Sequence, residues 1–148
     1  MKSLNIPDGL EEYSLNDRVM VRFNPTDLGF LERVAAAFEK LDAIQEEVRA
    51  SREKITDERE VFPLARELDA KMRAILNELF DADICTPLFG GMNLFASSGG
   101  LPVWANLMLA VSEEAENAMS TELAQREKRI SKYVKKYELQ SSINGNGR

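Results

Sequence analysis

The stretch between residues 82 and 104, ADICTPLFGGMNLFASSGGLPVW, constrains the fold of this chain more than any other. Helical periodicity stops there, and Gly-Gly pairs at 90–91 and 99–100 indicate sharp changes of backbone direction. Large apolar residues crowd into the same stretch: Leu88, Phe89, Leu94, Phe95, Leu101 and Trp104. Charged helical patterns lie on both sides, so we predict a rigid, largely buried corner that joins two helices.

The length of the chain, 148 residues, is that of one ordinary domain. A domain of this size buries roughly 68–70% of its unfolded surface and needs no metal or disulfide to hold it. We expect one helical domain over residues 1–138 and a disordered tail over 139–148, whose composition is polar and glycine-rich. Cys85 cannot form an internal disulfide, which fits a reducing cytosol and a buried structural thiol.

Residues 1–24 predict a small strand element. Period-two alternation gives a half-buried strand whose apolar face consists of Val19, Val21 and Phe23. Asn16-Asp17 can close a hairpin with residues 12–15. A two-residue loop, however, would pair Leu15 with Arg18 and place the apolar sets of the two strands on mismatched faces. We therefore predict the second strand and leave the first open.

Two helical patterns follow, each with a narrow apolar stripe. The first begins at a cap and proline signal over residues 24–27, which places the proline in its first turn. Gln45 interrupts its stripe, which consists of Leu31, Val34, Phe38, Leu41 and Val48. The second covers Val61–Phe80, and the charged run 51–60 between them is a loop or a solvated helix end. The two helices most simply form an antiparallel hairpin.

A third helical pattern begins at Pro102, with an apolar face made by Trp104, Leu107, Met108, Val111, Ala115 and Ala118. The stripe changes register near Met119, which fits either one long helix with a stutter or two helices broken near residues 120–121. Residues 122–138 are basic inside a protein of net charge −6. We expect an exposed basic arm that self-associates or docks a partner helix, with a solvated helix that covers the body as the alternative.

The fold class that these patterns predict is mostly α (α+β): a small N-terminal β element, a helical hairpin and a long C-terminal helix. The chain offers few side chains for catalysis or metal binding, because it contains no histidine and only one cysteine. The glycine pairs lack the nearby lysine of a phosphate loop. Carboxylates that could hold a divalent cation occur at positions 81, 83, 113, 114 and 116, although acidic residues on a polar helix face are normal solvated surface.

We therefore predict a protein that is not an enzyme and has no catalytic residue, no metal and no cofactor. The net negative charge argues against nucleic acid as a partner. The thin apolar face of the arm argues against a membrane surface, and no run of about 18 apolar residues predicts a membrane span or secretion signal.

Three stretches of the chain resemble a known protein family: YSLNDRVMVRFNPTDLGFLERVAAAFEKLD at 13–42, DAKMRAIL at 69–76 and LFGGMNLFASSGGLPVWANLMLAV at 88–111. The family is that of tail assembly chaperone-like proteins in siphovirus-type phages and prophages of Firmicutes. The most specific shared motifs are FNPTD at 23–27 and LFGGMN at 88–93. The resemblance covers residues 13–120, and its motifs are structural, not catalytic.

The resemblance implies a chaperone of the host cytoplasm that binds the tape-measure protein until tail-tube protein polymerises around it. Tail-tube protein is then a possible second partner, and self-association is expected. A structural virion or tail-associated protein is the alternative, and a carboxylate-dependent metal enzyme is a third hypothesis. No binding residues of the family can be carried over, so the predicted partner contacts rest on side-chain chemistry: Phe89, Phe95, Trp104, Tyr133 and Tyr137.

Overall fold

The computed structural model describes the backbone of residues 1–146 and the side chains up to Glu138, apart from those of Tyr133 and Tyr137. The elements in chain order are β1 (Glu11–Leu15), β2 (Val19–Phe23), α1 (Leu28–Lys54), a 3-10 turn (Glu58–Glu60), α2 (Val61–Phe80), α3 (Cys85–Phe89), β3 (Ser97–Ser98), β4 (Leu101–Pro102) and α4 (Val103–Asn146). The predicted fold class, mostly α with a small N-terminal sheet, is confirmed.

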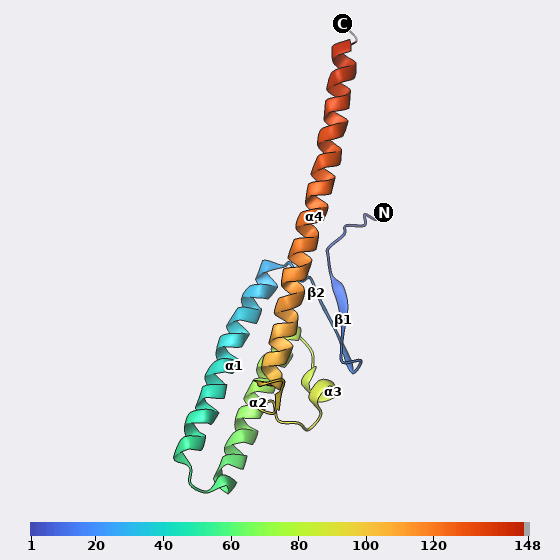
Figure 1. The fold of residues 1–148 in the computed structure, drawn as a ribbon. Coiled ribbons are helices and arrows are strands. Elements are labelled where there is room, and N and C mark those ends of the chain that lie inside the picture. The colour runs from blue at the N-terminus through green and yellow to red at the C-terminus, as the bar shows by residue number, and fades with distance from the viewer. Residues whose placement is uncertain (147–148) are drawn as a thin grey trace.

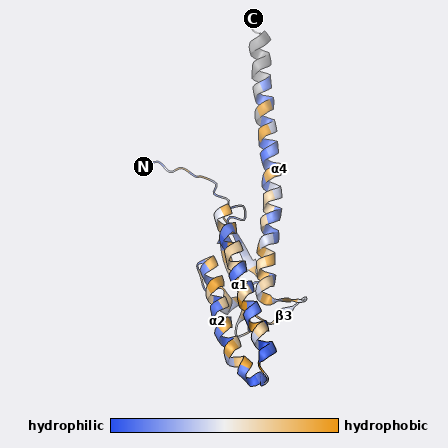
Figure 2. Ribbon diagram, turned by 90° about the vertical axis from the view of Figure 1, so that its left-hand side faces the viewer, coloured by the Kyte–Doolittle hydropathy of each residue, from blue (hydrophilic) through white to orange (hydrophobic). Residues whose placement is uncertain are grey.

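The body of the protein is a helical hairpin with the start of α4 packed against it (Figure 1). α1 and α2 run antiparallel, and the β1–β2 hairpin packs where α1 begins and α2 ends, with Phe23 of β2 stacked on Phe30 of α1 at a ring-centroid distance of 4.6 Å. α4 then continues as a single helix far beyond the body (Figure 1, Figure 2). None of the helices in the described part of the chain combines the length and apolar content that crossing a bilayer requires.

The hairpin register is set by one extra residue after its turn. Asn16 and Asp17 have φ angles of 53° and 56°, and the amide of Arg18 donates to the carbonyl of Leu15 at 3.0 Å. Leu15 nevertheless pairs with Val19, so Arg18 has no cross-strand partner and acts as a one-residue bulge. The apolar residues of both strands therefore share a face, and the mismatched two-residue-loop register is not the one that forms.

The entry into α1 differs from the prediction in one respect. Asp27 is the N-cap and accepts from the amide of Gly29 at 2.9 Å, so Pro25 lies before the cap and not in the first turn. The side-chain oxygen of Asn24 accepts from the amide and the hydroxyl of Thr26 at 2.8 and 2.9 Å. This turn supplies the bend between β2 and the helical hairpin.

The core is apolar and draws on every helix and on β2. In α1 the buried positions are Phe30, Val34, Ala37 and Leu41. Phe30 was missing from the predicted stripe, and Phe38, which was included, is 42% exposed. At about 100° per residue, the true face is rotated by roughly 40° from the predicted one. The predicted bounds of α2 are confirmed, and its buried positions are Leu68, Met72 and Leu76.

α4 is continuous through residues 120–121, so one long helix is the correct alternative. Its buried positions end at Ala115, and every described side chain from Ser120 onward is exposed. The side chains of residues 139–148, the predicted disordered tail, lie outside the described residues. The part of α4 beyond Ser120 is called the arm below.

Candidate functional site

An ion pair on α2 holds the glycine-rich corner in place. The carboxylate of Asp69 accepts from Arg73 Nε at 3.0 Å and from the amide of Leu94 at 2.7 Å. The guanidinium of Arg73 also donates to the carbonyl oxygens of Gly90 and Met92, at 2.8 and 2.6 Å. These hydrogen bonds attach the corner to the surface of α2. Within the corner itself only the short elements α3, β3 and β4 form.

The start of the corner is capped by side chains. Asn77 Oδ1 accepts from the amides of Ile84 and Cys85, at 2.9 and 3.1 Å, and Asn77 Nδ2 donates to Asp83. The amide of Thr86 donates to the carboxylate of Asp83 at 3.2 Å, and hydrogen bonds from Thr86 lower the pKa of Asp83. These bonds begin α3, a short helix that the glycine-rich composition did not predict.

An apolar groove of about 430 Å³ opens between the turn of the β hairpin, α3 and the first turns of α4. We call it the corner groove. Its rim is polar, and Arg18 on that rim donates to the carbonyl of Leu88 at 2.9 Å. The apolar lining consists of Leu15, Leu88, Phe89, Met92, Val103, Leu107 and Ala110. Since Met92 is 47% exposed, the groove presents apolar surface to an incoming chain.

The predicted contact residues fall in three different places. Phe89 is half-buried and lines the corner groove. Phe95 is half-buried against the core. Trp104 is 2% exposed, and its Nε1 donates to Gln45 Oε1 at 2.9 Å. The side chains of Tyr133 and Tyr137 lie outside the described residues. Among the three corner aromatics, only Phe89 borders the groove.

Sequence reasoning missed other groove residues, Leu15 and Met92 among them. Leu15 belongs to the strand that was left open, and its contact with the groove depends on the hairpin register. Met92 lies within the LFGGMN motif, so the motif itself was the available signal.

Carboxylates of the body serve as hydrogen-bond acceptors. The hydroxyl of Tyr13 lies 3.0 Å from Glu114 Oε1 and 3.2 Å from Glu11 Oε2, which joins β1 to α4. Burial, together with these two carboxylates, raises the pKa of Tyr13. Within the residues that the structure describes, no three acidic or cysteine side chains are grouped so that they could hold a metal ion.

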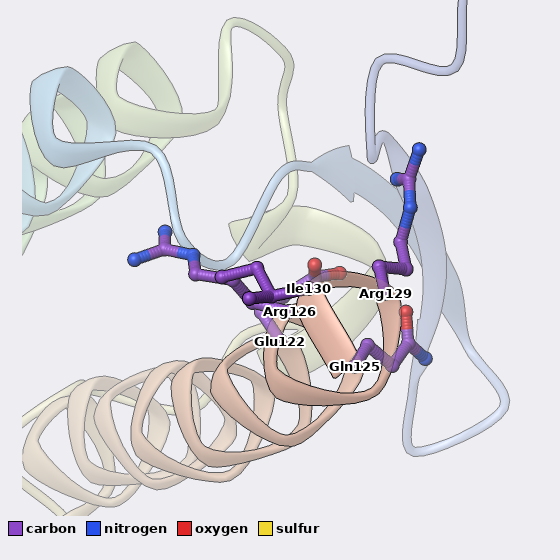
Figure 3. Close-up of a pocket in the computed structure, with 5 residues that line it drawn as sticks. All are labelled: Glu122, Gln125, Arg126, Arg129 and Ile130. Carbon is purple, nitrogen blue, oxygen red and sulfur yellow. The ribbon is translucent and has the colours of Figure 1, made fainter. Parts of the chain in front are cut away.

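A second hollow lies on the arm and is lined by residues of α4 alone (Figure 3). The residues that line it are Glu122, Gln125, Arg126, Arg129 and Ile130. Figure 3 shows Arg126 and Arg129 pointing away from one another. This hollow is the space between side chains on successive turns of one exposed helix, and it lacks the enclosing walls of a small-molecule site.

Comparison of the chain with known protein families, with curated proteins and with solved structures found no match. We therefore base the functional proposal on the corner groove, the exposed arm and the resemblance carried by the sequence motifs.

Proposed function

We propose that this protein is a phage tail assembly chaperone, a non-catalytic binding protein that holds the tape-measure protein soluble in the host cytoplasm. The observation that carries the proposal is the corner groove. The LFGGMN motif, on which the resemblance rests most specifically, supplies Leu88, Phe89 and Met92 to the groove lining. The motif therefore builds an exposed apolar surface in addition to turning the chain.

The chemistry of the groove suits a helical client. A long helical chain with exposed apolar stripes aggregates when it is alone. An apolar groove with a polar rim can accept one face of such a helix and exclude water from it. Phe89 and Met92 lie on a corner that Asp69 and Arg73 hold in place, so little ordering is required when a client binds.

The proposal is tested by co-expression with the tape-measure protein of the same genome, followed by affinity capture and gel filtration. We expect the tape-measure protein to become soluble and to co-elute with this chain. Met92→Glu should abolish co-elution, because it places a charge in the apolar lining of the groove. Met20→Glu is the matched control, since Met20 is 63% exposed on β2 and does not line the groove.

A tape-measure protein that stays insoluble while this chain elutes alone would count against the proposal. If Met92→Glu and Met20→Glu reduced co-elution equally, the groove would not be the site that binds the tape-measure protein. A chaperone should also be absent from purified phage particles. Detection of the chain there as a stoichiometric component would favour the structural tail protein instead.

A further inference from the structure

The basic residues of the arm gather on one face of its helix. At about 100° per residue, five of them fall within a sector of roughly 120°: Lys128, Arg129, Lys132, Lys135 and Lys136. Within residues 125–136 the same sector holds one other residue, Gln125, while Glu127 falls outside it. All five basic side chains are exposed. We call them the basic face.

α1 carries the opposite arrangement. Five of its acidic residues fall within a sector of roughly 80°, and none of its lysines or arginines does: Glu32, Glu39, Asp42, Glu46 and Glu53. The sector is completed by Leu28, Ala35 and Ala50, and all eight side chains are exposed. It is turned by roughly 150° from the buried positions of α1, so it points away from the core. We call the five acidic residues the acidic face.

The charges of both faces are largely unpaired within the chain. Among the side chains that the structure describes, no residue of the basic face takes part in an ion pair. In the acidic face Glu46 and Glu53 pair with Arg49 of the same helix, and these pairs are exposed. Exposed ion pairs along one helix are weak, so the acidic face stays available to a second partner.

The two faces lie apart within one chain. Trp104 in the first turn of α4 donates to Gln45 of α1 at 2.9 Å, and the two helices run antiparallel there (Figure 1). Lys128 lies 24 residues beyond Trp104, about 36 Å along the helix. α1 begins at Leu28, only 17 residues or about 26 Å from Gln45. Since α4 is continuous, its basic face lies past the start of α1 and does not reach the acidic face of its own chain.

We propose that the basic face of the arm docks on the acidic face of α1 in a second copy of this protein. The two faces match in sign and in number of charges, and both are straight helix surfaces. The basic face extends over about 12 Å and the acidic face over about 32 Å, so the arm fits within the length of α1. A nucleic acid is a poorer match for the arm, because the acidic body would repel it.

The contact joins two different surfaces, and each copy carries both of them. Two copies that exchange arms therefore form two identical contacts related by a two-fold axis. A single exposed ion pair contributes little, whereas several neighbouring pairs at each of two contacts act together. The inference rests on the placement of charges and is independent of the proposed role in tail assembly.

Sedimentation equilibrium of the purified full-length chain tests this contact. We expect wild-type protein heavier than the chain mass of 16.7 kDa, at twice that mass for exchanged arms, with an association that weakens as salt increases. An arm-reversed variant combines Lys128→Glu, Lys132→Glu and Lys135→Glu. It should raise the dissociation constant by at least roughly tenfold, because attraction becomes repulsion at three positions of each contact.

An α1-reversed variant provides the complementary test. It combines Glu32→Lys, Glu39→Lys and Asp42→Lys, which leaves the pairs of Arg49 intact, and it should dissociate to a similar extent. The arm-reversed and α1-reversed proteins should then associate with each other when mixed, because every contact between them again joins opposite charges. Circular dichroism checks that each variant is folded.

The control for total charge is a chain with three exposed basic residues reversed elsewhere: Arg59→Glu, Arg66→Glu and Lys71→Glu. It has the same net charge as the arm-reversed variant and should associate like wild type. A monomeric wild type, reversals without effect, a control that dissociates as readily as the arm-reversed variant, or two reversed variants that fail to associate when mixed would each overturn the proposal. The tape-measure protein is absent from these measurements, so their outcome is separate from that of the co-expression test.

Discussion

Asp69 and Arg73 form a nearly buried ion pair one turn apart on α2, with side chains that are 17 and 19% exposed. Each has a second role, because Asp69 accepts from the amide of Leu94 and Arg73 donates to the carbonyls of Gly90 and Met92. In a regular helix or strand, other backbone groups would form hydrogen bonds with such amides and carbonyls. In the corner, the side chains of the ion pair form them instead. The corner groove depends on this attachment.

We expect Arg73→Met to destabilise the protein by about 2–4 kcal/mol, because it leaves the carboxylate of Asp69 and two carbonyl groups without their donor. Lys71→Met is the control, since the Lys71–Glu67 pair is exposed and 3.8 Å long and contributes under about 1 kcal/mol. Urea denaturation followed by circular dichroism measures both. Equal effects of the two substitutions would show that the corner does not depend on Arg73.

Trp104→Ala should destabilise the protein by about 3–5 kcal/mol, since it empties a buried site and leaves Gln45 without its donor. The indole also packs edge-on against Phe38, with ring centroids 5.6 Å apart. Phe62→Ala, which truncates a side chain that is 57% exposed, should cost far less. A loss below about 1 kcal/mol for Trp104→Ala in equilibrium unfolding would contradict the burial of this side chain.

Asp81→Gly should stabilise the protein by about 0.5 kcal/mol. Asp81 ends α2 with φ 53° and ψ 37°, a left-handed conformation that glycine adopts without strain. The substitution also removes a negative charge from a helix C-terminus. Asp81→Ala is the control, because it removes the same charge but retains the Cβ, and we expect it to be less stable than Asp81→Gly by about 1 kcal/mol. Thermal unfolding of the two variants separates the contributions.

Cys85 should be unreactive in the folded protein. Its side chain is fully buried, and burial raises the pKa of the thiol to about 11 from its ordinary 9.0. Near neutral pH this lowers the thiolate fraction by roughly a hundredfold, so iodoacetamide labelling should be correspondingly slow until denaturant is added. Labelling at the rate of a free thiol without denaturant would contradict the burial.

The same shift in the pKa of Cys85 predicts a pH dependence. The thiol ionises at a lower pH in the unfolded chain than in the folded one, so the unfolded state loses its proton first. The contribution of Cys85 to stability is therefore constant below about pH 9 and falls between pH 9 and pH 11. Cys85→Ala should remove this part of the decline, which urea titrations across that range would measure.

Removal of residues 122–148 should leave the body folded. Every described side chain in that segment is exposed, so the free energy of unfolding of the body should change by less than about 0.5 kcal/mol. We also expect the truncation to alter self-association or partner binding, which gel filtration would measure. Global unfolding of the truncated chain would place the arm within the core and contradict the structure.

Periodicity alone predicted much of the fold. The spacing of apolar residues gave the bounds of α2, the antiparallel hairpin and the mostly α class correctly, because that spacing reflects the turn of a single helix. The register change near Met119 was also visible, and it marks the place where α4 leaves the body. For the candidate site, the sequence identified the LFGGMN motif and Phe89 but not the groove that they line.

Tertiary structure decided the rest. The sequence alone left the first strand open, because the bulge at Arg18 that aligns the two apolar faces accompanies a hydrogen bond to Leu88, far along the chain. Gln45 interrupted an apolar stripe for no local reason, yet in the folded protein it accepts from the indole of Trp104. Local patterns report the geometry of one element, whereas the partner of a polar group depends on which distant segment packs against it.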